Sequence, residues 1–345
     1  MKPENPQRII CHNPFEWFEI HPDGQVFACC PAWLKRSLGN LLTDDLDDIW
    51  NGSTARDLRR SIHDGSFRHC NRRRCPRLIS GTAPVGKLSE LKKGVARDVF
   101  ETKQTLLPWG PQKLNLCYDR SCNLACSSCR SGVYVASEEE RRRAEAISDR
   151  VQRELAPHAR QLIISGTGDP FASLAYRRLL EEFVPSNYPH LESIHLHSNG
   201  LLWDPAAWQS MQAVQPFVRT AEISIDAASG KTYSANRGGD FERLMENLNF
   251  LAGLPIAITL SFVVQQNNYR EMEDFVSLAQ GFGFAVYFSQ LVNWGTFSRE
   301  EFRRRAVHLS DHPEYPRFCN LLREMVNRQN VDIGNLQSVL TGQGG

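Results

Sequence analysis

The chain has 345 residues, which is enough for one large domain with a smaller attachment or for two domains. Hydrophobic residues make up 41% of it and charged residues 23%, a globular composition that excludes wholesale disorder. The formal net charge of +1 argues against nucleic acid as a partner, and no apolar run reaches the roughly 18 residues of a membrane span.

The first ten residues, "MKPENPQRII", lack the apolar core of a signal peptide, so we expect a cytoplasmic protein. Ten cysteines are many for such a protein. In a reducing compartment, clustered cysteines indicate metal binding rather than disulfides.

Residues 1–112 show several turn signals and little regular alternation. One helix is predicted over residues 46–65, broken near Asn51–Gly52, and "PWGPQ" (108–112) marks a junction. Half of the cysteines fall in this region, namely Cys11, Cys29, Cys30, Cys70 and Cys75. Arginines cluster at 72–74, 141–143 and 303–305, and a solvated face is the favoured interpretation of each cluster.

From Lys113 onward, short apolar runs with β-forming residues alternate with stretches of helical length. The predicted strands are residues 113–118, 161–166, 193–200, 220–226, 256–264 and 284–292. Clear helical patterns lie at 137–155 and 240–254, and another at about 315–329 in the tail. Such alternation predicts an α/β fold with a parallel sheet, either a partial (β/α) barrel or a flat doubly wound sheet.

The unusual residues all follow strands. The cysteines of "CNLACSSC" follow the first strand, "GTGDP" the second, "SNG" the third, and Asp226 the fourth. Because active sites of both α/β architectures lie at the carboxyl ends of their strands, we expect one site at this edge.

Cys122, Cys126 and Cys129 are spaced C-x3-C-x2-C on one short loop. Thiolates select zinc, copper(I) or iron–sulfur clusters. Three thiolates suit three corners of a cubane cluster and leave the fourth iron open to a small molecule. The alternative is a zinc knuckle completed by Cys117 or a distant histidine, although the usual zinc pattern has two paired elements.

This loop resembles the signature of the radical S-adenosylmethionine (SAM) superfamily. The resemblance implies a partial (β/α)6 TIM-like barrel and a [4Fe–4S] cluster whose open iron binds SAM. It also implies reductive cleavage of SAM to a 5′-deoxyadenosyl radical, which abstracts a hydrogen atom from the substrate. The matching segments further along the chain imply contacts to SAM by Gly166, Thr167, Gly168, Asp169, Ser198, Asn199, Ser224, Asp226, Arg237 and Val263.

Within this list, Asp169 is expected at the SAM amino group, Ser224 and Asp226 near the ribose, and Arg237 at the SAM carboxylate. One position departs from the family pattern. Ser128 stands where the family usually has an aromatic residue near the adenine, so adenine packing is expected from residues 261–264 instead.

The amino-terminal cysteines resemble those of the SPASM/twitch module, an accessory iron–sulfur fold of radical SAM enzymes. The resemblance implies one auxiliary [4Fe–4S] cluster, with four thiolates on a β-hairpin and a helix end. The implied ligands are Cys11, Cys29, Cys70 and Cys75, with Cys30 as an alternative to Cys29. A zinc ribbon is the competing interpretation. The expected domains are 1–108 (auxiliary), 109–292 (barrel) and 293–345 (a partly helical extension).

The sequence thus predicts a radical SAM oxidoreductase or epimerase, with a non-enzymatic iron–sulfur electron carrier or redox sensor as the alternative. Cys319 is a candidate hydrogen-atom donor, with helix packing as the other interpretation. Expected partners are a reductant such as flavodoxin or ferredoxin and a substrate that is a peptide or small molecule, with no membrane. Relatives with this module modify peptides, oxidise alcohols on sugars or mature other enzymes, and the sequence does not select among them.

Overall fold

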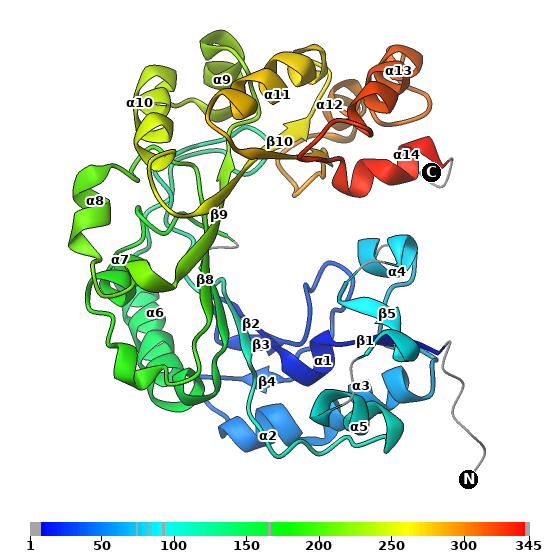
Figure 1. Cartoon of the computed structure of the whole chain (residues 1–345), viewed down its shortest axis with the longest axis vertical. Helices are drawn as coiled ribbons and strands as arrows, with labels where there is room; N and C mark the ends of the chain where they lie inside the picture. Colours follow the sequence, from blue (N-terminus) through cyan, green and yellow to red (C-terminus); the bar gives the residue numbers. More distant parts are fainter. Residues whose placement is uncertain (1–7, 74, 82, 92–93, 165–166, 342–345) are drawn as a thin grey trace. The chain divides into compact units, whose positions relative to one another are not determined.

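The computed structural model describes residues 8–73, 75–81, 83–91, 94–164 and 167–341 (Figure 1). The chain forms two compact units, and each is described by itself. Unit 1 consists of Met1–Asp119, Ser137–Thr167 and Val184–Ser193. Unit 2 consists of Arg120–Ala136, Gly168–Phe183 and Ile194–Gly345.

Unit 1 contains two sheets. A two-stranded antiparallel sheet pairs β1 with β5, and the other strands follow in the order β7-β6-β2-β3-β4. Its strands are β1 (Ile9–Cys11), β2 (Trp17–Ile20), β3 (Gln25–Phe27), β4 (Gly39–Asn40), β5 (Val85–Lys87), β6 (Lys113–Leu116) and β7 (Gln161–Ile164). Its α-helices are α1 (Asn13–Glu16), α2 (Leu46–Asn51), α3 (Ser53–His63), α4 (Pro76–Ser80), α5 (Val95–Glu101) and α6 (Glu138–Arg150), which continues as a π-helical turn, Val151–Leu155. Short 3₁₀ turns lie at Leu88–Glu90, Ala156–His158 and Pro185–Asn187.

The predicted helix at 46–65 is confirmed, and it breaks where expected, between α2 and α3. The break lies at Gly52, whose ψ of 175° is extended, and the position requires glycine because a Cβ there would lie 2.0 Å from the Asp48 carbonyl oxygen. Helix α6 begins at a capping box in which the Ser137 hydroxyl accepts from the Glu140 amide. The expected start of this helix is therefore also confirmed.

The amino-terminal region shares a sheet with the first strand of the predicted barrel. Strand β2 runs parallel to β6, and Trp17 to Ile20 align with Lys113 to Leu116. On its other side β2 forms an antiparallel hairpin with β3. This pairing buries Phe18 and Ile20 completely, so the cysteine-rich region is built onto the edge of β6.

Unit 2 carries a parallel set of strands in the order β12-β11-β10-β9-β8. They are β8 (Ser193–Ser198), β9 (Val218–Ser224), β10 (Ala257–Val264), β11 (Ala285–Gln290) and β12 (Val331–Asp332). The α-helices are α7 (Leu174–Glu181), α8 (Pro205–Ser210), α9 (Gly230–Arg237), α10 (Phe241–Leu251), α11 (Met272–Gly281), α12 (Arg299–Arg305), α13 (Tyr315–Met325) and α14 (Gln337–Leu340). Short 3₁₀ turns lie at Gln215–Phe217, Tyr269–Glu271 and Gly334–Leu336.

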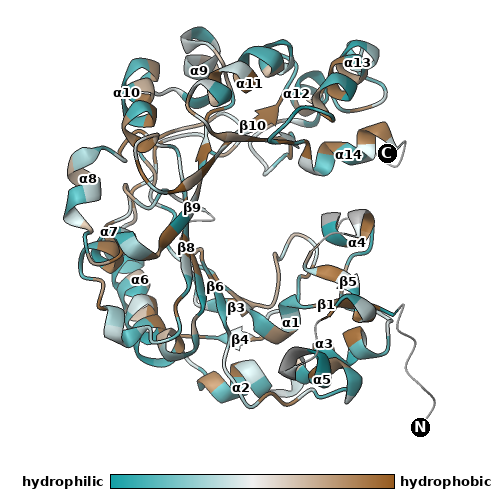
Figure 2. Cartoon of the chain, viewed as in Figure 1, coloured by the Kyte–Doolittle hydropathy of each residue, from teal (hydrophilic) through white to brown (hydrophobic). Residues whose placement is uncertain are grey.

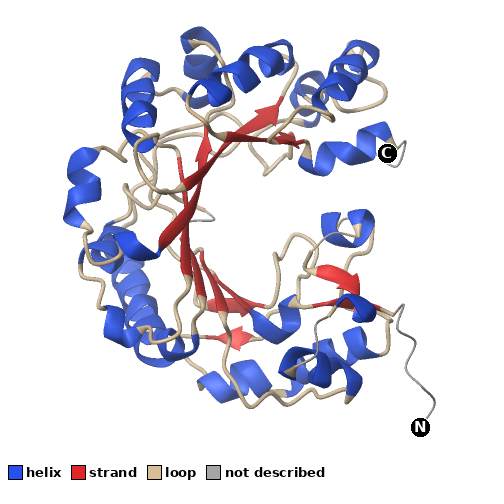
Figure 3. Ribbon diagram, in the orientation of Figure 1, coloured by secondary structure: helices blue, strands red, loops and turns tan. Residues whose placement is uncertain are grey.

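Helices cover one face of these strands (Figure 3), and the residues on that face are apolar and buried. Along β8, Ile194 and Leu196 are fully buried, whereas His195 and His197 on the opposite face are half-buried. Strand β10 is hydrophobic over most of its length (Figure 2). A doubly wound sheet has helices on both faces, so this one-sided arrangement favours the barrel alternative.

The six predicted strands are all present, and each ends within a few residues of its predicted end. The tail helix is shorter than expected, because α13 ends at Met325. In the part of the chain that the structure describes, no helix has the length and apolar character needed to cross a bilayer.

Candidate active site

The three-cysteine loop lies in unit 2 and has a defined backbone. Cys122 forms an antiparallel bridge with Tyr134, in which the Cys122 amide donates to the Tyr134 carbonyl at 2.8 Å. The Cys126 carbonyl accepts from the amides of Cys129 and Arg130, at 2.9 and 3.0 Å. This turn keeps the second and third thiols on one short arc.

The loop thiols interact electrostatically. Burial raises the pKa of the Cys126 thiol, and the neighbouring thiols Cys122 and Cys129 raise it further, while the Arg237 guanidinium opposes the rise. The Arg130 side chain hydrogen-bonds Cys129. Three thiolates close together need positive charge between them, and iron would supply it. The donor set therefore fits a cluster with three protein ligands.

Among the described residues, no three His, Cys, Asp or Glu side chains converge closely enough to hold a single metal ion. A cubane does not require such convergence, because each thiolate binds a different iron atom.

Asp169 ties together the loops after the second and third predicted strands. Its carboxylate accepts from the Ser198 hydroxyl at 2.9 Å and from the backbone amides of Asn199 and Phe171, at 2.8 and 2.9 Å. It is only 1% exposed, and burial raises the pKa of its carboxyl. The structure thus shows Asp169 as a brace for this turn, and its predicted contact with the SAM amino group stays a prediction.

The Asn199 side chain reaches the cysteine loop. Its amide nitrogen donates to Asn123 Oδ1 at 2.8 Å and lies 3.8 Å from Cys122 Sγ. The third-strand segment therefore meets the loop, as predicted from its place at the strand end. In unit 1, the Thr167 hydroxyl donates to the Cys117 carbonyl at 3.0 Å. Gly166 lies outside the described residues, while Gly168 is described.

Asp226 and Arg237 form a buried ion pair, with Arg237 Nη1 3.0 Å from Asp226 Oδ2. The other carboxylate oxygen accepts from the Val263 amide at 2.7 Å, and Arg237 Nη2 donates to the Ser224 carbonyl at 2.7 Å. Burial raises the pKa of the Asp226 carboxyl, and the Arg237 charge opposes that rise. These four residues, predicted separately as SAM contacts, are therefore bonded to one another.

Arg237 keeps one donor unused. Its Nε is buried and has no hydrogen-bond partner among the described residues. A buried N–H without a partner is costly. The neighbouring residue Asn236 accepts a hydrogen bond from the Ser127 amide of the cysteine loop at 3.2 Å, so Arg237 follows a residue that contacts this loop, and its unpaired donor fits the carboxylate of a bound SAM.

The uncovered face of β8 to β10 carries a polar row that the sequence analysis missed. His197 lies opposite Glu222, with 3.5 Å between Nε2 and Oε1, and 3.0 Å from the Ser224 hydroxyl, which in turn contacts Ser261 at 3.2 Å. Alternation along the strands held this signal, because His195 and His197 occupy the face opposite Ile194 and Leu196.

The amino-terminal thiols also come together, within unit 1. Cys11 ends β1, Cys29 follows β3, and Cys75 is the N-cap residue of α4. Burial raises the pKa of the Cys11 thiol, and Cys29, Cys70 and Cys75 each raise it further by their charge. The resemblance seen in the sequence placed the ligands on a β-hairpin and a helix end. For Cys11 this is wrong, because its strand β1 pairs with β5, whereas the hairpin is formed by β2 and β3.

Cys29 is better placed than Cys30 within this set. Its sulfur accepts from Trp33 Nε1 at 3.1 Å and Asn13 Nδ2 at 3.4 Å, contacts that suit a ligand thiolate. The charge of the Cys29 thiolate also raises the pKa of the Cys11 and Cys70 thiols. Cys30 lies beside Glu19, and burial together with that carboxylate raises the pKa of its thiol to about 12. The donor set therefore fits a cluster with four protein ligands.

Cys319 lies on α13 and is 6% exposed. Its side chain hydrogen-bonds the Tyr315 side chain one turn earlier. Phe318 on the same helix packs on Tyr269. The local surroundings are those of a helix-packing residue, and the predicted hydrogen-donor role stays a prediction.

Comparison with known proteins agrees with this organisation. The model of the radical SAM superfamily matches residues 119–279, and the SPASM iron–sulfur cluster-binding domain matches residues 11–76. The chain therefore carries a radical SAM domain that is preceded by a SPASM domain, and its fold is an α/β partial TIM barrel. These domains imply a [4Fe–4S] cluster with SAM and auxiliary iron–sulfur binding.

Two curated relatives illustrate the range of similar proteins. The AdoMet-dependent heme synthase of Nitratidesulfovibrio vulgaris is 28% identical over 173 residues, which are 49% of this chain and 44% of that protein. The mycofactocin maturase MftC of Mycobacterium tuberculosis is 26% identical over 175 residues, or 50% of this chain and 42% of that protein. The matched region is thus less than half of each relative.

Solved structures with a similar arrangement include Streptococcus suis SuiB bound to S-adenosylmethionine. It has a TM-score of 0.46 and 11% identity, over 94% of this chain and 70% of SuiB. Another is anSMEcpe with bound AdoMet, with a TM-score of 0.47 and 19% identity, over 68% of this chain and 63% of that protein.

Proposed function

We propose that this chain is a radical SAM enzyme that cleaves SAM reductively and abstracts a hydrogen atom from a C–H bond of its substrate. One observation carries the proposal. The Ser127 amide of the cysteine loop donates to the Asn236 carbonyl at 3.2 Å, and the next residue, Arg237, has a buried Nε donor without a partner among the described residues. An iron–sulfur site that only carried electrons would have no use for such a donor.

In this proposal Cys122, Cys126 and Cys129 hold the cluster, and Arg237 binds the SAM carboxylate. When bound, the cluster supplies the electron that cleaves SAM into methionine and a 5′-deoxyadenosyl radical. Asp226 keeps Arg237 in place through the 3.0 Å ion pair, and Asp169 fixes the turn that carries Asn199. These residues serve by holding the reactants in position.

We further propose that the substrate lies on the polar face formed by His197, Glu222, Ser224 and Ser261. Asn199, which contacts the cysteine loop, directly follows β8, and His197 precedes it by two residues on that strand. At the rise of an extended chain, His197 therefore lies roughly 7 Å from Asn199 along the strand, on the side away from the loop. Hydroxyl, imidazole and carboxylate groups suit a substrate with hydrogen-bonding groups, such as a peptide or a sugar alcohol. The reaction is of oxidoreductase or epimerase type.

The auxiliary ligands in this proposal are Cys11, Cys29, Cys70 and Cys75. With four thiolates every iron of that cluster has a protein ligand, so its role is to conduct electrons or to brace the domain. A reductant such as flavodoxin or ferredoxin supplies the electron for SAM cleavage.

The test is anaerobic incubation of the reconstituted chain with SAM and dithionite, followed by measurement of 5′-deoxyadenosine. The parent chain should form 5′-deoxyadenosine. Cys126→Ala should not, because the loop cluster has only three protein ligands and the variant lacks one of them. Cys319→Ser is the matched control and should cleave SAM like the parent. A parent chain that forms no 5′-deoxyadenosine while holding both clusters would support the electron-carrier alternative instead.

A further inference from the structure

A strongly basic segment carries two of the auxiliary thiols. Residues 68–77, "RHCNRRRCPR", contain five arginines, Cys70 and Cys75, and no acidic residue. Arg68, Arg72, Arg73 and Arg77 are exposed, and Arg74 lies outside the described residues. Because the whole chain has a net charge of only +1, this concentration of positive charge is local.

A second loop adds to it. The Asn71 amide donates to the Trp33 carbonyl at 2.8 Å, and Arg36 Nη1 lies 3.4 Å from His69 Nε2. Lys35 and Arg36 are exposed on this loop. We call the exposed cations of the two loops the basic rim, namely Lys35, Arg36, Arg68, Arg72, Arg73 and Arg77.

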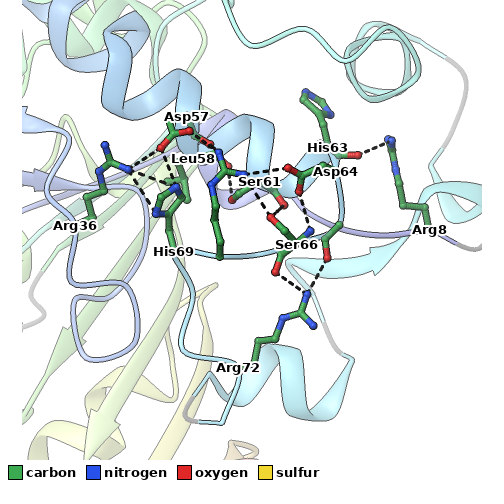
Figure 4. A network of polar contacts seen from close by, with 12 residues as sticks. Arg8, Arg36, Asp57, Leu58, Ser61, His63, Asp64, Ser66, His69 and Arg72 are labelled. Atoms are coloured by element: carbon green, nitrogen blue, oxygen red, sulfur yellow. Dashed lines mark hydrogen bonds and ion pairs between the residues drawn. The ribbon is translucent and has the colours of Figure 1, made fainter.

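Only part of the basic rim is neutralised. Figure 4 shows Arg36 and His69 directed at Asp57, with a distance of 2.8 Å from Arg36 Nη1 to Oδ2. Arg68 pairs with both Asp57 and Asp64. Hydrogen bonds from Arg36 and Arg68 lower the pKa of Asp57 to about 2, so it is anionic at neutral pH.

Lys35, Arg72 and Arg73 have no acidic partner among the contacts described. Arg72 donates to the carbonyl oxygens of Gly65 and Ser66, both at 2.8 Å, and its guanidinium covers the Phe67 ring. The side chains of Lys35 and Arg73 make no hydrogen bond or ion pair with another described residue. The five cations Lys35, Arg36, Arg68, Arg72 and Arg73 therefore meet two carboxylates, Asp57 and Asp64, and the rim keeps a net positive charge.

The basic rim also lies next to two of the auxiliary ligands, Cys29 and Cys70. Arg72 is exposed and lies two residues from Cys70 in the chain. Trp33, whose carbonyl joins the two loops, donates its indole N–H to Cys29 Sγ at 3.1 Å. Cys29, Cys70 and Trp33 are all partly exposed. The positive surface charge and these partly exposed residues thus lie on the same two loops.

We propose that the basic rim docks a small acidic electron-carrier protein, which exchanges single electrons with the auxiliary cluster. This inference rests on the proposed function for the existence of that cluster. In the transfer, the reduced cluster loses one electron and the carrier gains one, and no bond forms or breaks. Opposite charges accelerate the encounter, and the contact beside Cys29 and Cys70 shortens the path for the electron.

The experiment uses flavodoxin as the acidic carrier and the full chain with Cys126→Ala, in which the auxiliary cluster is the one expected to remain. The cluster is reduced with dithionite, the excess is removed, and oxidised flavodoxin is mixed in anaerobically by stopped flow. The rate of flavin reduction is followed by absorbance at several salt concentrations.

In this background, Lys35→Glu/Arg73→Glu should lower the second-order rate constant about tenfold at low salt. Its rate should also depend less on salt than the parent rate does, because the Debye length falls from about 30 Å at 0.01 M to about 10 Å at 0.1 M. The control is Arg142→Glu/Arg153→Glu, the same change of charge at two side chains that are 69% and 70% exposed on α6 and its π-helical turn. It should leave the rate within about twofold of the parent rate.

Equal losses in the rim and control variants, or a parent rate independent of salt, would overturn the docking proposal. A short RNA that binds the parent but not the rim variant, without rim-dependent electron transfer, would also overturn it in favour of a polyanion site. Dithionite-driven formation of 5′-deoxyadenosine, measured in chains with Cys126 intact, tests the proposed function separately, because dithionite requires no docking.

Discussion

At the scale of single residues, the site depends on contacts between side chains that were predicted one at a time. The sequence indicated Asp226 by its place after the fourth strand and Arg237 by the family resemblance; in the structure Asp226 follows β9 and Arg237 is the last residue of α9. Their ion pair could not be predicted, because a pattern identifies the residues that face a site but not the partners they take. The same holds for Asp169, whose carboxylate is occupied by Ser198 and the neighbouring amides.

Trp33 is expected to tune the auxiliary cluster through its hydrogen bond to Cys29. Trp33→Phe removes this bond and keeps an aromatic ring, so the reduction potential should become more negative. A net hydrogen bond of about 0.5–1.5 kcal/mol corresponds to roughly 20–60 mV for one electron. A redox titration monitored by electron paramagnetic resonance measures it, with the exposed Trp294→Phe as control. An unchanged potential in Trp33→Phe would show that the indole does not tune the cluster.

His195 should make stability depend on pH. Burial lowers its pKa to about 4, with the charge of His197 adding to the effect and that of Glu222 opposing it. The unfolded chain therefore binds more protons between about pH 6.5 and 4, and stability falls as the pH falls through this window. His195→Gln should reduce that fall, as measured by urea unfolding at pH 7 and pH 4.5. The same loss of stability in both proteins would contradict this assignment.

At the scale of elements, periodicity was sufficient for the barrel strands and insufficient for the amino-terminal region. Runs such as residues 193–198 alternate cleanly because one face packs against helices. Strands β1 and β5 have three residues each, too few for any period to show. The parallel register of β2 on β6 joins residues almost 100 positions apart, and no local pattern specifies such a pairing.

The conformation of the turn after β8 should require glycine at position 200. Its φ of +80° is one that other residues rarely adopt, and a Cβ would lie 2.8 Å from Leu244 Cδ1 and 3.0 Å from Ile223 Cγ2. Gly200→Ala should therefore lower the free energy of unfolding by about 1–3 kcal/mol. Gly281→Ala is the matched control, because nothing lies within 4 Å of its added Cβ. Denaturant unfolding measures the free energy of unfolding of both variants, and equal values would refute the expected strain at Gly200.

At the scale of the whole molecule, two separate thiol sets predict two cubanes. The reconstituted chain should hold about eight irons, and Cys70→Ala/Cys75→Ala about four. SAM cleavage should survive in that double variant, because the loop cluster has its own ligands. Cys30→Ser is the control for ligand choice and should keep the parent iron content, since Cys29 carries the two N–H···S contacts. A parent with about four irons and bound zinc would indicate a zinc-braced domain.

The central claim is that the three-thiol loop holds a cluster with one iron open to SAM. Electron paramagnetic resonance of the dithionite-reduced chain, recorded before and after addition of SAM, tests it most directly. We predict that SAM shifts the signal of one cluster, that the shift persists in Cys70→Ala/Cys75→Ala, and that it is lost in Cys126→Ala. A spectrum that SAM leaves unchanged in the parent chain, with both clusters present and reduced, would contradict the account.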